Sequence, residues 1–166
     1  TFKAHTGTTM GTHKWVETKI FRDINTPLKS LKSDNYQIVA ADTSGSTKDY
    51  RDIDYSVPTA LLLGAEKYGI SDAAYPYIDQ CITVPMMGMV ESFNVSVACA
   101  IILAEARRQR EVVGLYAKRQ ISDELFNRTI LEWTQPLVAR YCQKNDIKYP
   151  ELDGKGDIID PSWRSI

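Results

Sequence analysis

Cysteine and histidine are scarce in this chain of 166 residues, which has three cysteines and two histidines. Cys81, Cys99 and Cys142 are too few and too scattered for a disulfide framework or a C-x-x-C zinc site. Neither His5 nor His13 has a cysteine or carboxylate beside it at metal-ligand spacing. We therefore expect buried thiols and no metal site.

Long apolar runs and a signal-peptide layout are also missing. No stretch approaches the roughly 20 apolar residues of a membrane-spanning helix, and the first residues do not read as a secretory signal. The phosphate loops G-x-G-x-x-G and G-x-x-x-x-G-K-[ST] do not occur, which weakens the hypothesis of an α/β domain that binds some other nucleotide. These absences predict a cytoplasmic protein with no membrane partner.

An excess of positive charge is absent too, because 20 lysines and arginines face 21 aspartates and glutamates, for a net charge of −1. Dedicated nucleic-acid-binding domains are usually basic overall, so this balance argues against one. The distribution of charge is uneven, however, since five cations and only Glu111 of opposite sign lie between Arg107 and Arg119. Such a patch on a neutral protein suits a folded RNA held at one place.

Two apolar segments that end at loop-forming residues occupy the centre of the chain. Thr59 to Leu63 has the length of a buried strand and stops at Gly64, where a glycine lets a ligand approach the backbone. Cys81 to Val84 ends at Pro85, which withholds a ladder donor and turns the chain out of the sheet. This layout is typical of a ligand site at strand ends.

A long helix is predicted from about Val95, with Ser92 or Asn94 as its cap. Its first three turns, VSVACAIILA, are apolar on nearly every side and are expected to be buried. Three arginines follow near its end: Arg107, Arg108 and Arg110. They can pair with phosphates, although a solvated cationic turn that complements the helix dipole explains them at least as well.

The remaining pattern predicts an α/β fold with a parallel sheet covered by helices on both faces. Further strands are expected at about Trp15 to Phe21 and at Tyr36 to Ala41, with a helix from Pro27 to about Ser33 between them. After Leu115 the chain reads as an amphipathic α-helical C-terminal tail. We therefore predict a domain over residues 1–117 and a helical extension over residues 118–166.

The segments LLLGAEKYGIS (residues 61–71) and ITVPMMGMVESFNVSVACAIILAEARRQR (residues 82–110) resemble the second and third motifs of the SpoU family of RNA 2'-O-ribose methyltransferases. The likeness continues through DYRDIDYSVPTALL upstream and IKYPELDGKGDI downstream, so it covers nearly the whole chain. It implies S-adenosyl-L-methionine as cofactor, S-adenosyl-L-homocysteine as product, a C-terminal deep trefoil knot and a homodimer formed through the knot region. The substrate it implies is a tRNA D-loop guanosine, with rRNA as the alternative.

The resemblance also assigns cofactor contacts to five positions: Ala41, Gly64, Val84, Met86 and Phe93. The family usually has leucine where this chain has Phe93, so adenine packs differently there. Three polar positions match the family's functional residues: Glu66, Ser92 and Asn94. The resemblance implies that Asn94 and Ser92 position the loop and substrate and that Glu66 fixes the pocket or an RNA-binding arginine. Without it, two helix caps and a surface carboxylate are the better interpretation.

The family's first motif, of the type N-x-x-x-x-x-R-T-A, does not occur in these 166 residues. In the family, its arginine is the proposed activator of the ribose hydroxyl. The start of the chain, TFKAHTGTTMG, looks like the family immediately after that motif. We therefore expect a further segment upstream of Thr1 and little methyl transfer without it. The alternative is a noncatalytic RNA-binding protein of the same fold.

Overall fold

The structure, a computed structural model, describes residues 16, 18–43, 45–89 and 92–163. The chain divides into two compact units, one spanning Lys19–Lys118 and the other containing the chain from Arg119 onward. In the first unit the helices and strands are α1 (Asn25–Ser33), β1 (Gln37–Ala41), β2 (Lys48–Asp49), η2 (Tyr50–Asp52), β3 (Thr59–Leu63), η3 (Asp72–Tyr77), β4 (Gln80–Thr83) and α2 (Val95–Val112). The second contains α3 (Asp123–Thr134) and α4 (Pro136–Asn145).

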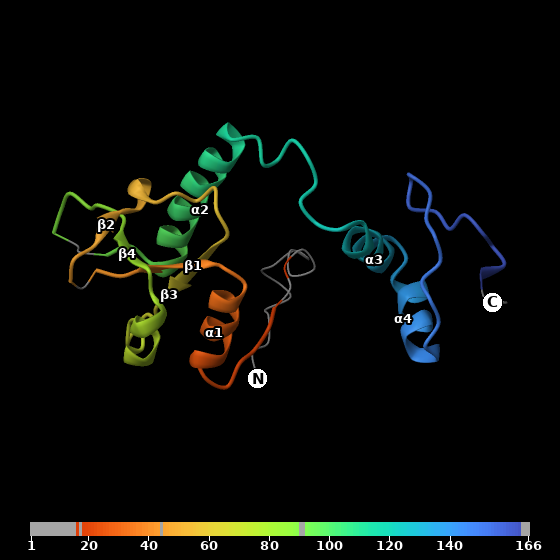
Figure 1. The fold of residues 1–166 in the computed structure, drawn as a ribbon, viewed down its shortest axis with the longest axis horizontal. Coiled ribbons are helices and arrows are strands. Elements are labelled where there is room, and N and C mark those ends of the chain that lie inside the picture. Colours follow the sequence, from red (N-terminus) through yellow and green to blue (C-terminus); the bar gives the residue numbers. More distant parts are fainter. Residues whose placement is uncertain (1–15, 17, 44, 90–91, 164–166) are drawn as a thin grey trace. The chain divides into compact units, whose positions relative to one another are not determined.

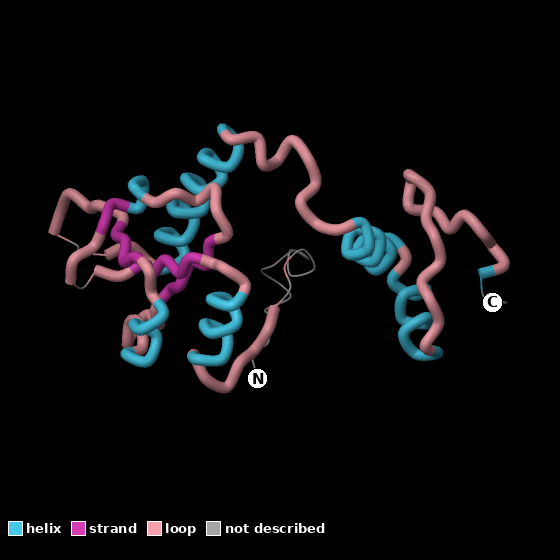
Figure 2. The backbone as a smooth tube through the Cα atoms, in the orientation of Figure 1, coloured by secondary structure: helices cyan, strands magenta, loops and turns pink. Residues whose placement is uncertain are grey.

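The four strands form one parallel sheet in the order β2-β4-β1-β3 (Figures 1 and 2). β1 is paired on both sides, with Ala41 opposite Leu63 of β3 and also opposite Ile82 of β4. The predicted strand at Thr59 to Leu63 is confirmed, and those at Tyr36 to Ala41 and Cys81 to Val84 are confirmed to within one residue at either end. The carboxyl ends of β1, β3 and β4 therefore meet at one edge of the sheet.

Helices cover both faces of this sheet, as predicted, and Figure 1 shows α1 and α2 on opposite sides of it. Side chains of consecutive residues in a strand point to opposite faces. Val39 and Ile82 accordingly pack in one cluster with Ile102 of α2. Ile38 packs in the other cluster with Leu28 of α1 and with η3. The sheet is therefore the centre of a three-layered unit.

Helix α2 is less buried than its apolar sequence predicted. Among its described residues only Ile102 is buried, whereas Val97 is 46% exposed and Leu103 is 54% exposed. The helix packs against the sheet cluster through Ile102 and Ala106, and that contact uses one side of the helix. An apolar face of α2 consequently lies at the surface of this chain.

Two predictions outside the main strands also need correction. The predicted strand at Trp15 to Phe21 lies partly outside the described residues, and the structure assigns no strand to residues 18–21. The sequence also predicts no strand between Ala41 and Thr59, but Lys48 and Asp49 in that polar segment form β2, the strand beside β4. A two-residue polar strand has no alternating apolar pattern that the sequence could reveal.

The second unit contains the two helices predicted after Leu115. The hydroxyl of Ser122 accepts a hydrogen bond from the Leu125 N–H (3.2 Å) and so caps α3. Pro136 occupies the first turn of α4, where its missing N–H is not needed. Trp163 is buried and lies edge-on to Tyr141, with 5.8 Å between ring centroids, so it anchors the last part of the chain that the structure describes. Within the described part of the chain, none of the helices is long and apolar enough to cross a membrane.

Candidate functional site

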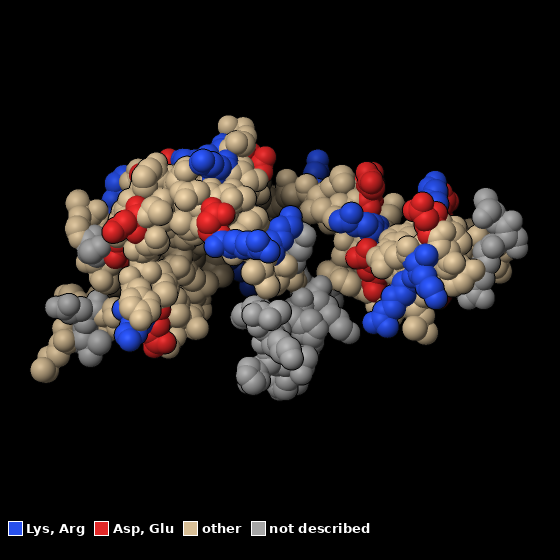
Figure 3. Space-filling model, turned by 90° about the horizontal axis from the view of Figure 1, so that it is seen from below, with Lys and Arg blue, Asp and Glu red and all other residues tan. Residues whose placement is uncertain are grey.

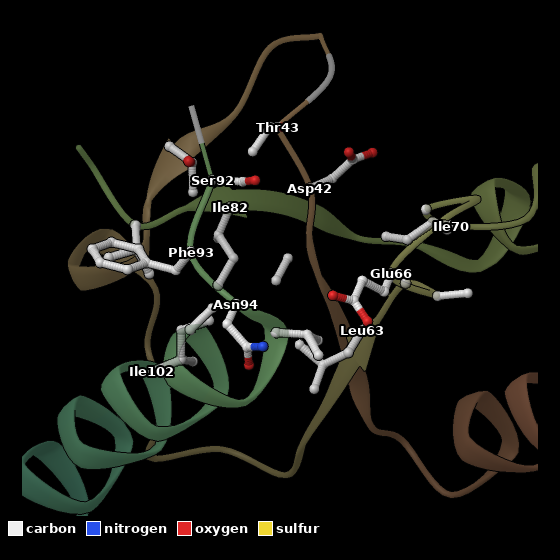
Figure 4. Close-up of a pocket in the computed structure, with 18 residues that line it drawn as sticks. Asp42, Thr43, Leu63, Glu66, Ile70, Ile82, Ser92, Phe93, Asn94 and Ile102 are labelled. Atoms are coloured by element: carbon white, nitrogen blue, oxygen red, sulfur yellow. The ribbon is translucent and has the colours of Figure 1, made fainter. Parts of the chain in front are cut away.

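A cavity of about 450 Å³ lies at the carboxyl ends of β1, β3 and β4 (Figure 4). Its wall is drawn from residues 41–43, 63–70, 82–84 and 92–102, so the start of α2 closes one side. Small-molecule sites have volumes of roughly 300–1,000 Å³, and those of open parallel sheets lie outside the carboxyl ends of the strands. Position and size both identify this cavity as the candidate site.

Seven of the residues predicted from the sequence line this cavity: Ala41, Gly64, Glu66, Val84, Ser92, Phe93 and Asn94. Figure 4 shows Glu66 and Asn94 entering it from different elements, the loop after β3 and the start of α2. Met86 is half-buried and is not part of the wall, so its cofactor contact stays a prediction. The fold thus brings together residues that are more than 50 positions apart, from Ala41 to Asn94.

A neighbouring turn explains why position 64 is a glycine. A Cβ atom on Gly64 would lie 2.5 Å from the carbonyl carbon and 2.8 Å from the carbonyl oxygen of Gly69. Residues 65 to 69 fold back as a tight turn, in which the Ala65 N–H donates to the Gly69 carbonyl (2.9 Å) and the Gly69 N–H donates to the Ala65 carbonyl (2.7 Å). Glycine is therefore required because two backbone segments touch. The sequence alone instead explains this glycine by close approach of a ligand.

Asn94, and not Ser92, caps α2. Its Oδ1 accepts a hydrogen bond from the Ser96 N–H at 2.9 Å. Its side-chain nitrogen is hydrogen-bonded to none of the described residues, while the residue lines the cavity. The cap and the predicted functional role are therefore compatible, because they use different atoms of one amide.

We expect Asn94→Ala to lower the free energy of unfolding by about 1 kcal/mol through loss of the cap. Asn94→Ser keeps a capping oxygen and is expected to remain within a few tenths of a kcal/mol of the wild type. Urea denaturation of both variants measures the cap. If the amide nitrogen contacts a ligand in the cavity, both variants should lose methyl transfer to the same extent. Wild-type methyl transfer in Asn94→Ser would show that Asn94 acts only as a helix cap.

Among the described residues of the cavity wall two carry charge, Asp42 and Glu66, and both are acidic. The Tyr75 hydroxyl donates a hydrogen bond of 2.6 Å to Asp42 Oδ2, across 33 positions of sequence. The sequence prediction missed Asp42, although an acidic residue directly after a buried strand was a readable signal. A wall with two carboxylates favours a ligand that carries positive charge.

The three predicted arginines do not lie in the cavity wall. They occupy the far half of α2, roughly 20 Å from Asn94 at 1.5 Å per residue. Arg107 is exposed, whereas Arg110 is half-buried. On the face shown in Figure 3, basic and acidic side chains are interspersed. An RNA contact at these arginines would therefore be local and remote from the cavity of the same chain.

Arg108 is held in place by Glu105. Its Nε and Nη2 donate to the two carboxylate oxygens of Glu105 at 2.8 and 2.7 Å. Hydrogen bonds from Arg108 and then from Gln109 lower the pKa of Glu105 to about 2, so the carboxylate stays charged. A guanidinium has five N–H groups, and this pairing leaves its other edge able to meet a phosphate.

Gln109 joins this pair to the loop before β3. Its Oε1 accepts from the Tyr55 N–H (2.9 Å), and its Nε2 donates to the Ile53 carbonyl (3.0 Å) and to Glu105 Oε1 (2.9 Å). Gln109 was missed from the sequence because its backbone partners, at Tyr55 and Ile53, lie more than 50 positions away. Glu105 was missed as well, although its partner Arg108 lies within one helical turn. These hydrogen bonds fix the arginine-bearing half of α2 to the loop before β3.

No group of three or more His, Cys, Asp or Glu side chains among the described residues is arranged to hold a metal ion. The absence of a metal site stays a prediction for the whole chain. Cys142 is buried, while Cys81 and Cys99 are half-buried. Burial raises the pKa of the Cys81 and Cys142 thiols, which makes them poor nucleophiles.

Fold and cavity together define an α/β protein with a ligand site at its strand ends, and comparison with known families gives the class. The model of the SpoU rRNA Methylase family matches residues 3–104, and the model of the SpoU rRNA methylase C-terminal region matches residues 108–161. The chain belongs to the SpoU methylase family.

Individual relatives are similar along most of the chain. The tRNA (guanosine(18)-2'-O)-methyltransferase of Escherichia coli is 38% identical over 156 residues, which are 92% of this chain and 68% of the relative. The enzyme of the same name from Thermus thermophilus is 41% identical, over 76% of this chain and 65% of its own. The crystal structure of the A. aeolicus TrmH/SpoU tRNA modifying enzyme is 36% identical with a TM-score of 0.72, and the match covers 88% of this chain and 70% of that one. The chain thus spans about two thirds of the length of these relatives.

Proposed function

We propose that this protein transfers a methyl group from S-adenosyl-L-methionine to the ribose 2'-hydroxyl of a tRNA nucleotide, the D-loop guanosine. The observation that carries the proposal is the cavity at the ends of β1, β3 and β4, lined by the motif residues of a SpoU methylase. Relatives named as tRNA (guanosine(18)-2'-O)-methyltransferases support the substrate and the reaction.

The cavity suits this cofactor in size, polarity and charge. Leu63, Ile82 and Phe93 give apolar walls for an adenine ring. Asp42 and Glu66 supply negative charge, which favours a cationic sulfonium over a neutral thioether. When bound, the cofactor supplies the electrophilic methyl group. Backbone groups at Ala41, Gly64, Val84 and Phe93 would hold the adenosine, with Met86 packed nearby.

The polar residues of the wall orient the substrate. In this proposal the side-chain nitrogen of Asn94, with Ser92 beside it in the chain, positions the ribose. Glu66 fixes the loop after β3 or pairs with an arginine that reaches the site. Bringing a hydroxyl into line with the methyl carbon and excluding water would lower the barrier by proximity. The hydroxyl must also lose its proton, a task that the resemblance gives to the arginine of the family's first motif and not to a residue of this cavity wall.

We propose that the active form is a homodimer whose subunits each contain a deep trefoil knot. Membership of the SpoU family supports the knot, and convergence of the loops after β3 and β4 with the start of α2 on one cavity is compatible with it. The exposed apolar face of α2, with Val97 and Leu103, supports the dimer, because burying it needs another surface. The arginines of α2 would then serve RNA bound across two subunits.

The division into a methyltransferase domain over residues 1–117 and a helical extension over residues 118–166 is part of the same proposal. The change near Lys118, from a unit with a sheet to a unit in which the described residues form helices and loops, supports it. A protein that modifies tRNA is expected in the cytoplasm.

Cofactor binding and methyl transfer test the proposal separately. We expect calorimetry in the presence of a chelator to detect S-adenosyl-L-methionine and S-adenosyl-L-homocysteine, with a preference for the cation. Tritium transfer from labelled cofactor, followed by nucleoside analysis, should place the label on a tRNA guanosine ribose when the protein also carries the arginine-bearing first motif of the family, whereas the 166 residues alone should transfer little. No heat and no thermal shift with either ligand in a folded sample would refute the cofactor. Label in rRNA alone would favour that substrate, and binding of RNA without transfer would favour a noncatalytic protein.

A further inference from the structure

The turn of residues 65–69 is a fixed projection beside the cavity. Besides the two Ala65–Gly69 hydrogen bonds, the Tyr68 N–H donates to the Ala65 carbonyl at 3.2 Å. Gly64 packs directly on the Gly69 backbone, so the base of the turn is pinned to the end of β3. Side chains at the tip of this turn therefore have a fixed position relative to the end of β3.

The tip presents an aromatic ring to solvent. Tyr68 is 79% exposed, and the Lys67 ammonium lies over its ring at 5.3 Å from the centroid. The hydroxyphenyl group contributes nothing to either hydrophobic cluster of the unit. A large aromatic side chain on a pinned turn, two positions from a residue of the cavity wall, has the placement of a binding group and not of a core group.

The charges around the cavity restrict where the phosphates of an RNA backbone can lie. Asp42 and Glu66 line the cavity and repel phosphates, whereas Lys67, the next residue after Glu66, is not part of the wall and lies over the Tyr68 ring. A ribose that enters the cavity must therefore keep its phosphates outside, on the side of Lys67 and Tyr68. Bases of unpaired nucleotides are commonly bound by stacking on exposed aromatic rings, with nearby cations on the backbone.

We propose that Tyr68 is a stacking platform for an unpaired base of the RNA substrate, next to the nucleotide whose ribose enters the cavity, and that Lys67 contacts the adjoining phosphate. This inference rests on the proposed RNA methyl transfer. It assigns the turn after β3 two functions: Glu66 faces the cavity, and Tyr68 faces the RNA. Stacking tolerates any base, so Tyr68 contributes affinity and orientation and does not read the sequence.

Tyr68→Ala and Tyr68→Phe separate stacking from the hydroxyl. Removal of a stacking ring costs about 1–3 kcal/mol per base, so the tRNA affinity of Tyr68→Ala is expected to fall by roughly 5- to 150-fold. Tyr68→Phe keeps the ring and should stay within about twofold of the wild type. The affinity for S-adenosyl-L-methionine should be unchanged in both. Tyr36→Ala is the matched control, because Tyr36 is also exposed but precedes the amino end of β1.

A 2-aminopurine placed beside the target guanosine in a D-arm stem-loop gives a direct readout of stacking. Its fluorescence should change on binding to the wild type and to Tyr68→Phe but not to Tyr68→Ala. Wild-type RNA affinity in Tyr68→Ala, or equal losses in the Ala and Phe variants, would overturn this inference alone. If the wild type binds cofactor but no RNA, the proposed function fails as well, and the two failures are thereby distinguished.

Discussion

Adding one methyl group at Gly64 should abolish cofactor binding. In Gly64→Ala, the new Cβ would meet the Gly69 carbonyl carbon at 2.5 Å and its Cα at 2.9 Å, and both are backbone atoms that cannot rotate away. The turn of residues 65–69 must then separate from the end of β3, and it carries Glu66 out of the cavity wall. We expect a loss of stability of about 2–3 kcal/mol and no measurable heat with S-adenosyl-L-methionine.

The matched control is Gly154→Ala, because a Cβ at Gly154 meets nothing within 4 Å. That variant should unfold at the same urea concentration as the wild type and bind cofactor equally well. Thermal unfolding and calorimetry on the two variants separate local misfit from the general cost of losing a glycine. A Gly64→Ala protein with normal stability and affinity would show that the turn is free to move and that the cavity does not depend on it.

The double variant Arg107→Ala/Arg108→Ala should weaken tRNA binding by at least tenfold. Each phosphate contact contributes roughly 0.7–0.9 to the slope of log affinity against log salt, so the slope should flatten by about 1.5. Both side chains are exposed on α2, and Arg108 is oriented by Glu105. Cofactor affinity should not change, because neither residue lines the cavity. Filter binding at several salt concentrations measures the effect.

A double variant with the same loss of charge, Arg22→Ala/Lys29→Ala, controls for net charge, since both residues are exposed near α1. It should shift tRNA affinity by no more than about twofold. Equal losses in the two double variants would mean that overall charge, and not the α2 patch, attracts RNA. A second diagnostic is Glu105→Gln, which removes the carboxylate that orients Arg108 and one negative charge near it. Weaker binding in that variant supports orientation, and stronger binding contradicts it.

The strands that could be predicted are those whose residues carry a local signal. Thr59 to Leu63 is an uninterrupted apolar run between Pro58 and Gly64, and its bounds were predicted without error. β2 could not be foreseen, because Lys48 and Asp49 are polar and become a strand only by pairing with Ile82 and Thr83. That pairing joins positions more than 30 residues apart, which no local pattern encodes.

The candidate site divides in the same way. Glu66, Ser92 and Asn94 were predicted because they stand in motifs, and the structure adds that all three line the cavity and that Asn94 caps α2 through its Oδ1. Asp42 was missed although its position directly after a buried strand could be read from the sequence, whereas its hydrogen bond to Tyr75 (2.6 Å) appears only in the fold. Burial of α2 was overpredicted because its apolar faces were assumed to be covered by this one chain.

The order of the sheet has a consequence for how the protein is made. β1 leaves the ribosome first of the three strands that end at the cavity, yet it lies between the two that follow, β3 and β4. During synthesis the backbone groups of β1 stay unpaired until β3 and β4, about 20 and 40 residues later in the chain, have been made. The cavity is complete only when α2 has also been made. A half-made chain thus has no donor site at all. The cofactor is a ligand of the finished fold alone, and at 100 times its dissociation constant it stabilises that fold by about 2.7 kcal/mol. A supply of the methyl donor is therefore expected to stabilise the folded chain, by an amount that rises with the free concentration of the donor.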